Sequence, residues 1–495
     1  MNSLVLFLLL GSSLVPAVVI FLLKEKSAKW RNSINLIGIF FKLFLVGYLI
    51  DGLLSSKEFY FSYMLTPSIS FVLKVDYFSL LFATLSSVLW LFTTLYAIGY
   101  LKNSKNQSRF FGFFSLCVTA TVGLSISGNL FTFFIFYEFL TLVTFPLILH
   151  EQNRESIRAA AIYLAYTIVG GLFFLVGLVM LQGISGDMEF VSGGYLSVDG
   201  ASPIYLQILF ILLLIGVGVK AAIFPLHHWL PTAMAAPAPV SALLHAVAVV
   251  KAGAFGIVRI VYDVYGIDFA SSLGLLLVVM IVACVTIIYG SIMALRQSEL
   301  KKRLAYSTVS QVSYIMLGVS IFGHIGTIGG IIHLVHQGIM KITLFFCAGS
   351  FAKTYGVQKI DEVDGLGYSM PLLSLAFSIA ALGMIGIPPT VGFLSKWYLG
   401  LGALDNGLWA VLGVLVASSV LNAMYFLPII YRMWFLPPLK TVQLIEKPAY
   451  LESMALLIVP PLFTAFFTLL FGVFAFSEWS VLEWVHLLVK VEYPK

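Results

Sequence analysis

The chain alternates long apolar runs with short polar connections. A helix needs about 20 apolar residues to cross a hydrocarbon core of about 30 Å, and there it satisfies its own backbone groups. The pattern therefore predicts an all-α membrane protein with about 14 transmembrane helices, the first of which is retained rather than cleaved. The predicted helices lie near residues 3–23, 33–52, 76–100, 110–127, 130–149, 158–182, 205–230, 236–262, 271–294, 302–321, 326–352, 371–400, 407–431 and 452–475.

Composition agrees with this fold class. Hydrophobic residues make up 60% of the chain, charged residues only 10%, and the mean hydropathy is +1.02, far from soluble domains. Cys117, Cys284 and Cys347 fall within predicted helices without pair spacing, which argues against a disulfide framework or a metal cluster. No nucleotide, flavin or haem motif occurs. We expect no cofactor and no redox chemistry in this chain alone.

Basic residues in the loops orient the chain. Eighteen lie in loops after odd-numbered spans, whereas only Lys57 lies in a loop after an even-numbered span. By the positive-inside rule, the odd loops are cytoplasmic and both termini are outside, in a plasma membrane. The net charge of +6 therefore reflects topology and predicts no nucleic-acid partner. The eighteen are Lys24, Lys26, Lys29, Arg31, Lys102, Lys105, Arg109, Arg154, Arg158, Arg296, Lys301, Lys302, Arg303, Lys353, Lys359, Arg432, Lys440 and Lys447.

Two spans are interrupted in a similar way. One contains Pro225 five residues after Lys220, and the other contains Pro388 and Pro389 before Lys396. Broken helices at matching positions of two halves point to an ion site built on inverted repeats. We predict a three-helix segment at 1–109, five-helix repeats at 110–262 and 271–434 in opposite orientations, and a C-terminal transmembrane helix with a short amphipathic tail at 435–495.

Five charged residues lie deep in the apolar spans: Glu138, Lys220, Lys251, Lys341 and Lys396. A charge at mid-membrane costs about 2.5–3.5 kcal/mol on insertion scales, so these residues are candidates for an ion pathway. Glu138 is the only acid placed deep in a span, and Lys220 is its candidate partner. The alternative is a structural salt bridge between helices. A pair that closes in one state and opens in another would let the lysine pass on its proton.

Three histidines extend this set. His333 and His336 are neighbours on one helix surface, with Lys341 beyond them, and histidine suits proton relay. His245 precedes Lys251 in its span, and a packing role for it stays open. A metal site at His333 and His336 is weakly indicated, because neither Cys nor carboxylate lies nearby in the sequence. We predict a line of titratable groups across the midplane.

Four other charged residues receive structural interpretations. Lys42 is expected to extend its ammonium to the membrane surface. Lys74 and Asp76 flank the start of the third span and are expected to pair locally. Arg259 lies near the outer end of its span and is also expected to be structural.

Four longer motifs carry a resemblance to a known family: KAAIFPLHHWLPTAMAAPAPVSALLHAVAVVKAG (220–253), LKKRLAYSTVSQVSYIMLG (300–318), HLVHQGIMKITLFFCAG (333–349) and GMIGIPPTVGFLSKW (383–397). In this order they resemble the antiporter-like subunits shared by respiratory complex I, Mrp-type sodium/proton antiporters and membrane-bound hydrogenases. Thr232 stands where many complex I members carry an acid. The length and Lys396 favour the D-type Mrp subunit or its hydrogenase and complex I relatives.

The resemblance implies a function and partners. Glu138 and Lys220 match the family's proton-driving ion pair, and Lys251, His333, His336, Lys341 and Lys396 match the groups beyond it. We expect a proton-translocating subunit, most simply of a cation(Na⁺)/H⁺ antiporter, that assembles with homologous and other membrane subunits. The alternatives are a proton-pumping subunit of a complex I-like NADH/quinone oxidoreductase or membrane-bound hydrogenase, a stand-alone solute carrier, and a structural anchor.

Overall fold

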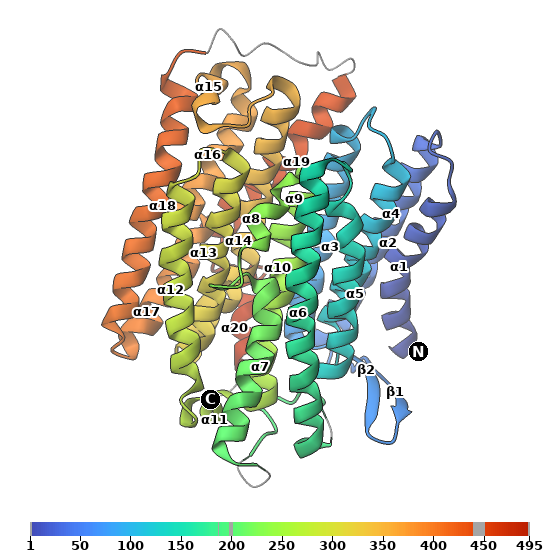
Figure 1. The fold of residues 1–495 in the computed structure, drawn as a ribbon, viewed down its shortest axis with the longest axis vertical. Helices are drawn as coiled ribbons and strands as arrows, with labels where there is room; N and C mark the ends of the chain where they lie inside the picture. Colours follow the sequence, from blue (N-terminus) through green and yellow to red (C-terminus); the bar gives the residue numbers. More distant parts are fainter. Residues whose placement is uncertain (1, 187, 198–200, 439–450, 494–495) are drawn as a thin grey trace.

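The protein is described by a computed structural model that covers residues 2–186, 188–197, 201–438 and 451–493. Nearly all of these residues are helical, and most helices run along the long axis of the molecule (Figure 1). The first half consists of α1 (Asn2–Leu22), α2 (Ala28–Leu54), α3 (Tyr77–Tyr100), α4 (Gln107–Ser125), α5 (Leu130–Ile148), α6 (Arg154–Ser185) and α7 (Pro203–Ala221).

The second half has longer helices separated by several short ones. The long helices are α12 (Leu275–Leu295), α13 (Leu300–Ser320), α14 (His324–Tyr355), α16 (Pro371–Ile385), α17 (Val391–Asp405), α18 (Trp409–Phe435) and α19 (Leu451–Val473). The short ones are α8 (Trp229–Thr232), η1 (Ala233–Ala235), α11 (Ile267–Ser272), η4 (Ile360–Glu362) and α15 (Leu366–Ser369).

The helix count agrees with the predicted fold class. In the described part of the chain, 12 helices are long and apolar enough to cross a membrane. The more polar α13 and the consecutive pair α16 and α17 account for the two remaining predicted spans. The protein is thus an all-α, multi-pass membrane protein. Lys440 and Lys447, which contributed to the predicted orientation, lie outside the described residues.

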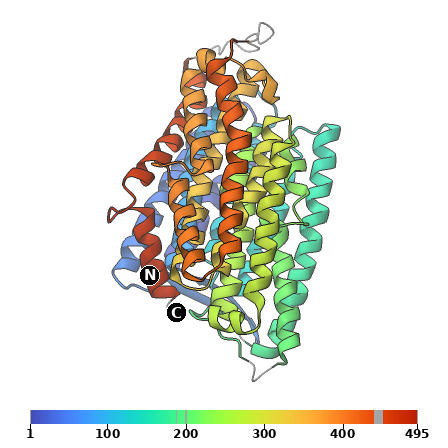
Figure 2. The ribbon, with the colours of Figure 1, turned by 90° about the vertical axis from the view of Figure 1, so that its left-hand side faces the viewer.

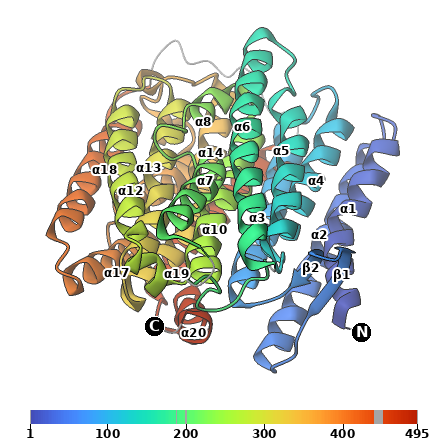
Figure 3. The ribbon, with the colours of Figure 1, turned by 60° about the horizontal axis from the view of Figure 1, so that its bottom comes forward.

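The helices place the candidate residues in the interior. Helices α1, α2 and α4 form one edge and α17 and α18 the opposite edge, with α7, α10 (Val249–Arg259), α13 and α14 between them (Figures 1 and 3). Helix α14 is buried along its whole membrane-crossing window, as is the eighth span at 238–265. The candidate residues of these two helices are therefore shielded from lipid.

Both predicted breaks are present. Helix α7 ends at Ala221, and Ala222 adopts a left-handed conformation (φ 56°) before Pro225. Helix α16 ends at Ile385, Gly386 has φ 94°, and α17 begins at Val391 after the two prolines. At the first break the Trp229 indole donates to the Val219 carbonyl (2.7 Å), so a side chain satisfies a backbone group that the break frees.

A third irregular span was not predicted. The eighth span consists of α9 (Ala238–Ala242), a π-helical turn η2 (Leu243–Val247), α10 (Val249–Arg259) and a second π-helical turn η3 (Ile260–Tyr265). Ala248, between His245 and Lys251, leaves helical geometry (φ −113°, ψ −82°). Pro or Gly within 243–248 would have been a sequence signal, but neither occurs there. π-helical turns are common near functional sites.

A β-hairpin was also not predicted. Strands β1 (Tyr60–Thr66) and β2 (Ile69–Lys74) pair antiparallel between α2 and α3. The hairpin lies at the end of the molecule where both termini are found (Figures 1 and 3). Its turn contains Pro67 and Ser68, which is a turn signal that the hydropathy pattern does not register.

The C-terminal tail is a docked helix. Helix α20 (Val481–Glu492) follows α19 after a short connection at the side of the molecule (Figure 2) and packs against α3 and α14. Its apolar face, formed by Leu482, Val485, Leu488 and Val489, is buried. The predicted amphipathic character of the tail is therefore used for contact with the protein's own helices.

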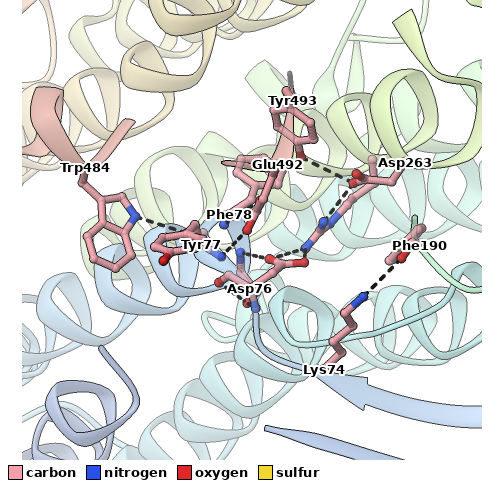
Figure 4. Close-up of polar contacts among 11 residues, drawn as sticks. Lys74, Asp76, Tyr77, Phe78, Phe190, Asp263, Trp484, Glu492 and Tyr493 are labelled. Carbon is pink, nitrogen blue, oxygen red and sulfur yellow. Dashed lines mark hydrogen bonds and ion pairs between the residues drawn. The ribbon is translucent and has the colours of Figure 1, made fainter. Parts of the chain in front are cut away.

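A cluster of charged residues holds the end of α20, and it corrects one prediction (Figure 4). Asp76 does not pair with Lys74. Its carboxylate binds the Arg259 guanidinium (2.8 Å), which also binds Asp263 (2.8 Å). Glu492 accepts hydrogen bonds from the backbone N–H groups of Tyr77 and, at 3.3 Å, Phe78, at the start of α3. Arg259 thus has a structural role here.

Lys42 corrects another prediction. Its side chain is fully buried, so it does not extend to the membrane surface. The ammonium donates to the Ser13 hydroxyl (2.8 Å) and lies 5.5 Å from the centre of the Trp90 ring.

Candidate functional site

The site begins with Glu138 on α5. The side chain is half-buried, and among the described residues its Oε1 has no hydrogen-bond partner. Helix α6 approaches it through Gly171: a Cβ atom at residue 171 would lie 2.6 Å from Oε1. Only glycine therefore leaves room for the carboxylate in this position. The sequence pattern did not predict that Gly171 contacts Glu138.

Lys220 lies in the last turn of α7, beside the same part of α5. Its ammonium is 3.4 Å from the centre of the Tyr137 ring and donates to the Tyr137 carbonyl. The Tyr137 hydroxyl in turn donates to the Gly216 carbonyl of α7 (2.7 Å). Cation–π contact stabilises an ammonium that has left water. Tyr137 thus joins α5 to the end of the broken helix.

Glu138 and Lys220 are neighbours without being in contact. Their charges act on each other, yet the ion pairs among described residues do not include this one. In this conformation the ammonium faces Tyr137 instead. The pair is therefore open in this conformation, and it lies beside the break that follows α7.

Lys251 on α10 lies one helix further in. It is fully buried, and none of the described residues forms a hydrogen bond with its ammonium. Two residues later, Gly253 lets α10 approach α7 closely, since a Cβ there would be 2.2 Å from the Ala221 nitrogen. Lys251 is therefore held next to the first break by close backbone contact.

Three titratable residues of α14 lie close enough to Lys251 to feel its charge. Its charge acts on His333, His336 and Lys341, and Lys341 acts on His245. The structure therefore brings together the predicted residues of the eighth and eleventh spans. The centre of the His245 ring lies 4.6 Å from that of Phe345, with the two rings tilted by 32°, and neither nitrogen of His245 has a hydrogen-bond partner among the described residues.

Two residues of α14 are anchored by neighbouring helices. His333 Nδ1 lies 2.8 Å from the Ser395 hydroxyl of α17, and its ring lies 5.2 Å from Tyr314 of α13. The Lys341 ammonium donates to the Leu304 carbonyl (3.1 Å) and to the Ser307 hydroxyl of α13. These contacts fix the histidine and the lysine at opposite ends of one buried polar region.

Lys396 ends the line at the second break. Its ammonium donates to the carbonyls of Met384 (3.0 Å) and Ile385 (2.7 Å), the last residues of α16, and to the Ser419 hydroxyl (3.2 Å). A cation is favoured at a helix C-terminus, where carbonyl groups lack partners. Lys396 also borders a cavity of 520 Å³ between α17 and α18.

Several polar residues of the site were not singled out from the sequence. Gln311 on α13 and Gln337 on α14 are fully buried, and no described residue hydrogen-bonds to either amide. Ser307, Gln311 and Tyr314 recur every three or four residues, a helical spacing that could have indicated a polar face of α13. Buried polar groups are normally satisfied by protein or by water. The region between α10, α13, α14 and α17 thus suits a hydrated path.

Comparisons with known proteins agree with this arrangement. Residues 127–422 match the family NADH:quinone oxidoreductase/Mrp antiporter, TM. NADH-quinone oxidoreductase subunit N of Desulforudis audaxviator is 37% identical over 340 residues, which are 68% of this chain and 67% of that protein. Putative antiporter subunit mnhA2 of Staphylococcus haemolyticus is 33% identical over 418 residues, which are 79% of this chain. The match spans only 50% of mnhA2.

A solved structure shares the whole fold. A chain of the membrane-bound sulfane sulfur reductase, an archaeal respiratory membrane complex, superposes with a TM-score of 0.85. It is 25% identical, and the match covers 99% of this chain and 96% of that one. The family match includes α5 to α17 and thereby every candidate residue from Glu138 to Lys396. The chain belongs to the NADH:quinone oxidoreductase/Mrp antiporter family of membrane proteins.

Proposed function

We propose that this chain is the proton-translocating subunit of a multisubunit membrane complex and that the complex is a cation/proton antiporter of the Mrp type. The observation that carries the proposal is the line from the half-buried Glu138 through the buried Lys220, Lys251 and α14 residues to the partly buried Lys396. The relative mnhA2, described as a putative antiporter subunit, supports the antiporter assignment.

Proton transfer would start at the open pair of Glu138 and Lys220. When the two charges approach, Lys220 is held in its protonated form; when they separate, burial favours loss of its proton. The proton would then pass to Lys251, next to the α7 break, and along the histidines of α14 toward Lys341 and Lys396. At 4 Å and an effective dielectric constant of 20, such a pair is worth about 4 kcal/mol, enough to change a protonation state.

Partners and location follow from the same reasoning. The relatives are named as subunits or are part of complexes, so we propose that other membrane subunits, including homologous antiporter-like ones, bind this chain. The apolar side chains exposed on α1, α2, α6 and α18 are available for lipid or for such partners. We place the protein in the plasma membrane with both termini outside the cytoplasm.

A redox-driven pump is the second candidate. The relatives that favour it are subunit N of an NADH-quinone oxidoreductase and the chain from an archaeal respiratory complex. In such a complex, electron transfer in partner subunits would drive the same proton line. The two candidates differ in the energy source and agree on the residues.

The test replaces Glu138 by Gln in the assembled complex. The amide keeps the shape beside Gly171 but cannot ionise, so we expect cation-driven proton flux in proteoliposomes to fall by about a hundredfold or more, as for loss of an acid–base group. Glu58→Gln, at an exposed loop carboxylate, is the matched control. Full flux from Glu138→Gln would refute the pathway.

The same proteoliposomes distinguish between the two possible driving forces. A sodium gradient without an electron donor should drive proton flux in the antiporter, whereas a redox pump should respond only to its electron donor. Transport by the purified single chain would instead indicate a stand-alone carrier.

A further inference from the structure

Helix α2 carries a second buried polar stripe, away from the line described above. Arg31, Asn35 and Lys42 are 1%, 0% and 0% exposed, although α2 lies at the edge of the molecule. Their spacing of four and seven residues places them on one face of the helix. That face is directed at α1 and α4, as their hydrogen bonds show.

Helix α4 presents a matching stripe. The Arg31 guanidinium donates to the Ser108 hydroxyl (3.2 Å), and the Ser115 hydroxyl donates to the Asn35 amide oxygen (2.9 Å). The Lys42 ammonium donates to the Ser13 hydroxyl of α1, which lies 2.7 Å from the Thr119 hydroxyl. We call these residues, Ser13, Arg31, Asn35, Lys42, Ser108, Ser115 and Thr119, the α2–α4 ladder.

The ladder leads from one end of the molecule to the middle of α2. At that end, the backbone N–H of Ser108 donates to the exposed Glu25 carboxylate (3.2 Å), beside Arg31. The loop that contains Glu25 also contains Lys24 and Lys26, so it lies on the proposed cytoplasmic side. Lys42, near the midpoint of α2, is the innermost member.

If the ladder were purely structural, its buried polar atoms would all have hydrogen-bond partners, but several of them have none among the described residues. Among the described residues, Arg31 Nε and Asn35 Nδ2 have no hydrogen-bond partner, and neither does the indole nitrogen of Trp90, whose ring faces Lys42. No described carboxylate pairs with Lys42 either. Interhelical hydrogen bonds hold helices together, but a buried ammonium without a counter-charge is costly and is typical of a functional group.

We propose that the α2–α4 ladder is a hydrated proton-access route from the cytoplasmic side to Lys42, separate from the line that begins at Glu138. Water would join its hydroxyl and amide groups, and Lys42 would accept and release the proton. Arg31 at the outer end repels alkali cations, whereas a chain of hydrogen bonds can still pass a proton. The route rests on the proposed function, because it would feed the same proton transfer.

Helix α3 is where the route would join the central line. It packs against both α2 and α14. Ser86, Trp90 and Thr94, four residues apart on one face, are buried and have side-chain polar atoms without a partner among the described residues. This face extends the polar surroundings of Lys42 along α3, because Trp90 belongs to it and its ring faces the ammonium.

The first experiment measures proton flux in the assembled complex with Lys42→Met. Methionine removes the charge and keeps an apolar volume, so assembly and thermal stability should be kept. We expect flux per assembled complex to fall by roughly tenfold, as for loss of a proton-carrying group. Unchanged flux, with or without lower thermal stability, would show that Lys42 is structural and overturn the proposal.

A matched pair of serines on α1 tests the contact itself. The Ser13 hydroxyl contacts Lys42 and Thr119, whereas the Ser12 hydroxyl donates to the Leu9 carbonyl of its own helix (2.7 Å) and to no other described residue. Ser13→Ala should lower the flux and Ser12→Ala should leave it unchanged. Equal effects of the two would contradict the route.

Water access is tested independently of transport. Asn35→Cys or Lys42→Cys, in a chain that also carries Cys117→Ala, Cys284→Ala and Cys347→Ala, should react with a small hydrophilic thiol reagent, and Ser12→Cys should not. Protection of both ladder positions would overturn the proposal even if a flux variant fails to assemble. Glu138→Gln in the same membranes separates the outcomes: if it abolishes flux while Lys42→Met does not, only the ladder proposal fails.

Discussion

The buried lysines differ in what their ammonium groups contact. Lys396 caps the carbonyls at the end of α16, and Lys220 rests on an aromatic ring and a carbonyl. Lys251 has no hydrogen-bond partner among the described residues. Groups that are already bound are held in place, whereas an unbound ammonium can respond to its neighbours. Lys251 is therefore the lysine best placed to change its protonation during transfer.

The carboxylate of Glu138 is constrained by a single glycine, and this gives a prediction. In Gly171→Ala the new methyl group would meet Oε1 at 2.6 Å, so the carboxylate must move away from its place beside Lys220. We expect proton flux to fall by about tenfold to a hundredfold, since misplacement of a reacting group by 1 Å can have that effect.

The same helix offers the control for this prediction. Gly183, also on α6, has no atom within 4 Å of an added Cβ, so Gly183→Ala should leave flux unchanged. Flux assays on complexes of equal assembly compare the two variants. Normal flux in Gly171→Ala would show that the position of Glu138 is not critical.

At the scale of elements, the sequence determines which residues are in the membrane better than which way they face. Proline marked both breaks, at Pro225 and at Pro388 and Pro389, and apolar length marked the spans. Rotation of each helix about its axis is not specified by hydropathy where every face is apolar, as on α5. The site residues could therefore be predicted, but the contact of Lys220 with Tyr137 could not.

Elements outside the helical pattern were harder to predict. The hairpin of β1 and β2 is short and lies between the long apolar sequences of α2 and α3. The π-helical turn at 243–247 contains no Pro or Gly that would indicate an irregular helix. Docking of α20 depends on Asp76, Arg259 and Asp263, which come from distant parts of the chain. Such contacts follow from tertiary structure alone.

Helix α20 gives a prediction about pH. Burial raises the pKa of Glu492 well above 4.5, as do the carboxylates of Asp76 and Asp263, against the lowering effect of Arg259 and of the Tyr77 N–H. An acid with a raised pKa in the docked state binds its proton more tightly there. Docking is therefore strongest at or below pH 4.5 and weakens as pH rises through the raised pKa.

Hydrogen exchange measures this effect. The protection of the α20 amides, corrected for intrinsic exchange, should fall as the pH rises from 4.5 through the raised pKa of Glu492. The total fall should be about tenfold for each unit by which docking raises that pKa. Glu492→Gln should remove the pH dependence, and Glu478→Gln, at an exposed carboxylate before α20, should keep it. Lys74, Tyr262 and Tyr493 also lie around the cluster, so a pH dependence that persists in Glu492→Gln would assign it to them.

At the scale of the whole molecule, both ends of the chain lie at the end that carries the hairpin (Figure 1). An even number of membrane spans places both ends of a chain on the same side, and the orientation proposed from the loop charges puts that side outside the cytoplasm. Lys29, in the first turn of α2, and Lys57, in the loop after α2, are both exposed and lie at opposite ends of that helix.

The orientation is tested with cysteines at these two positions. A membrane-impermeant thiol reagent added to intact cells should label Lys57→Cys and leave Lys29→Cys unlabelled until the cells are opened. The reverse pattern would invert the proposed orientation and would make the end at which the α2–α4 ladder begins external.

The balance of charge along the central line has a consequence for ion selectivity. Among its described residues, the line contains one acid, Glu138, and four lysines, which are Lys220, Lys251, Lys341 and Lys396. Each protonated lysine raises the electrostatic barrier to a sodium ion, while proton hopping needs no sodium-sized site. A sodium ion exchanged by the complex would therefore cross the membrane through a different subunit, and this chain would act as the proton-selective half of the exchanger.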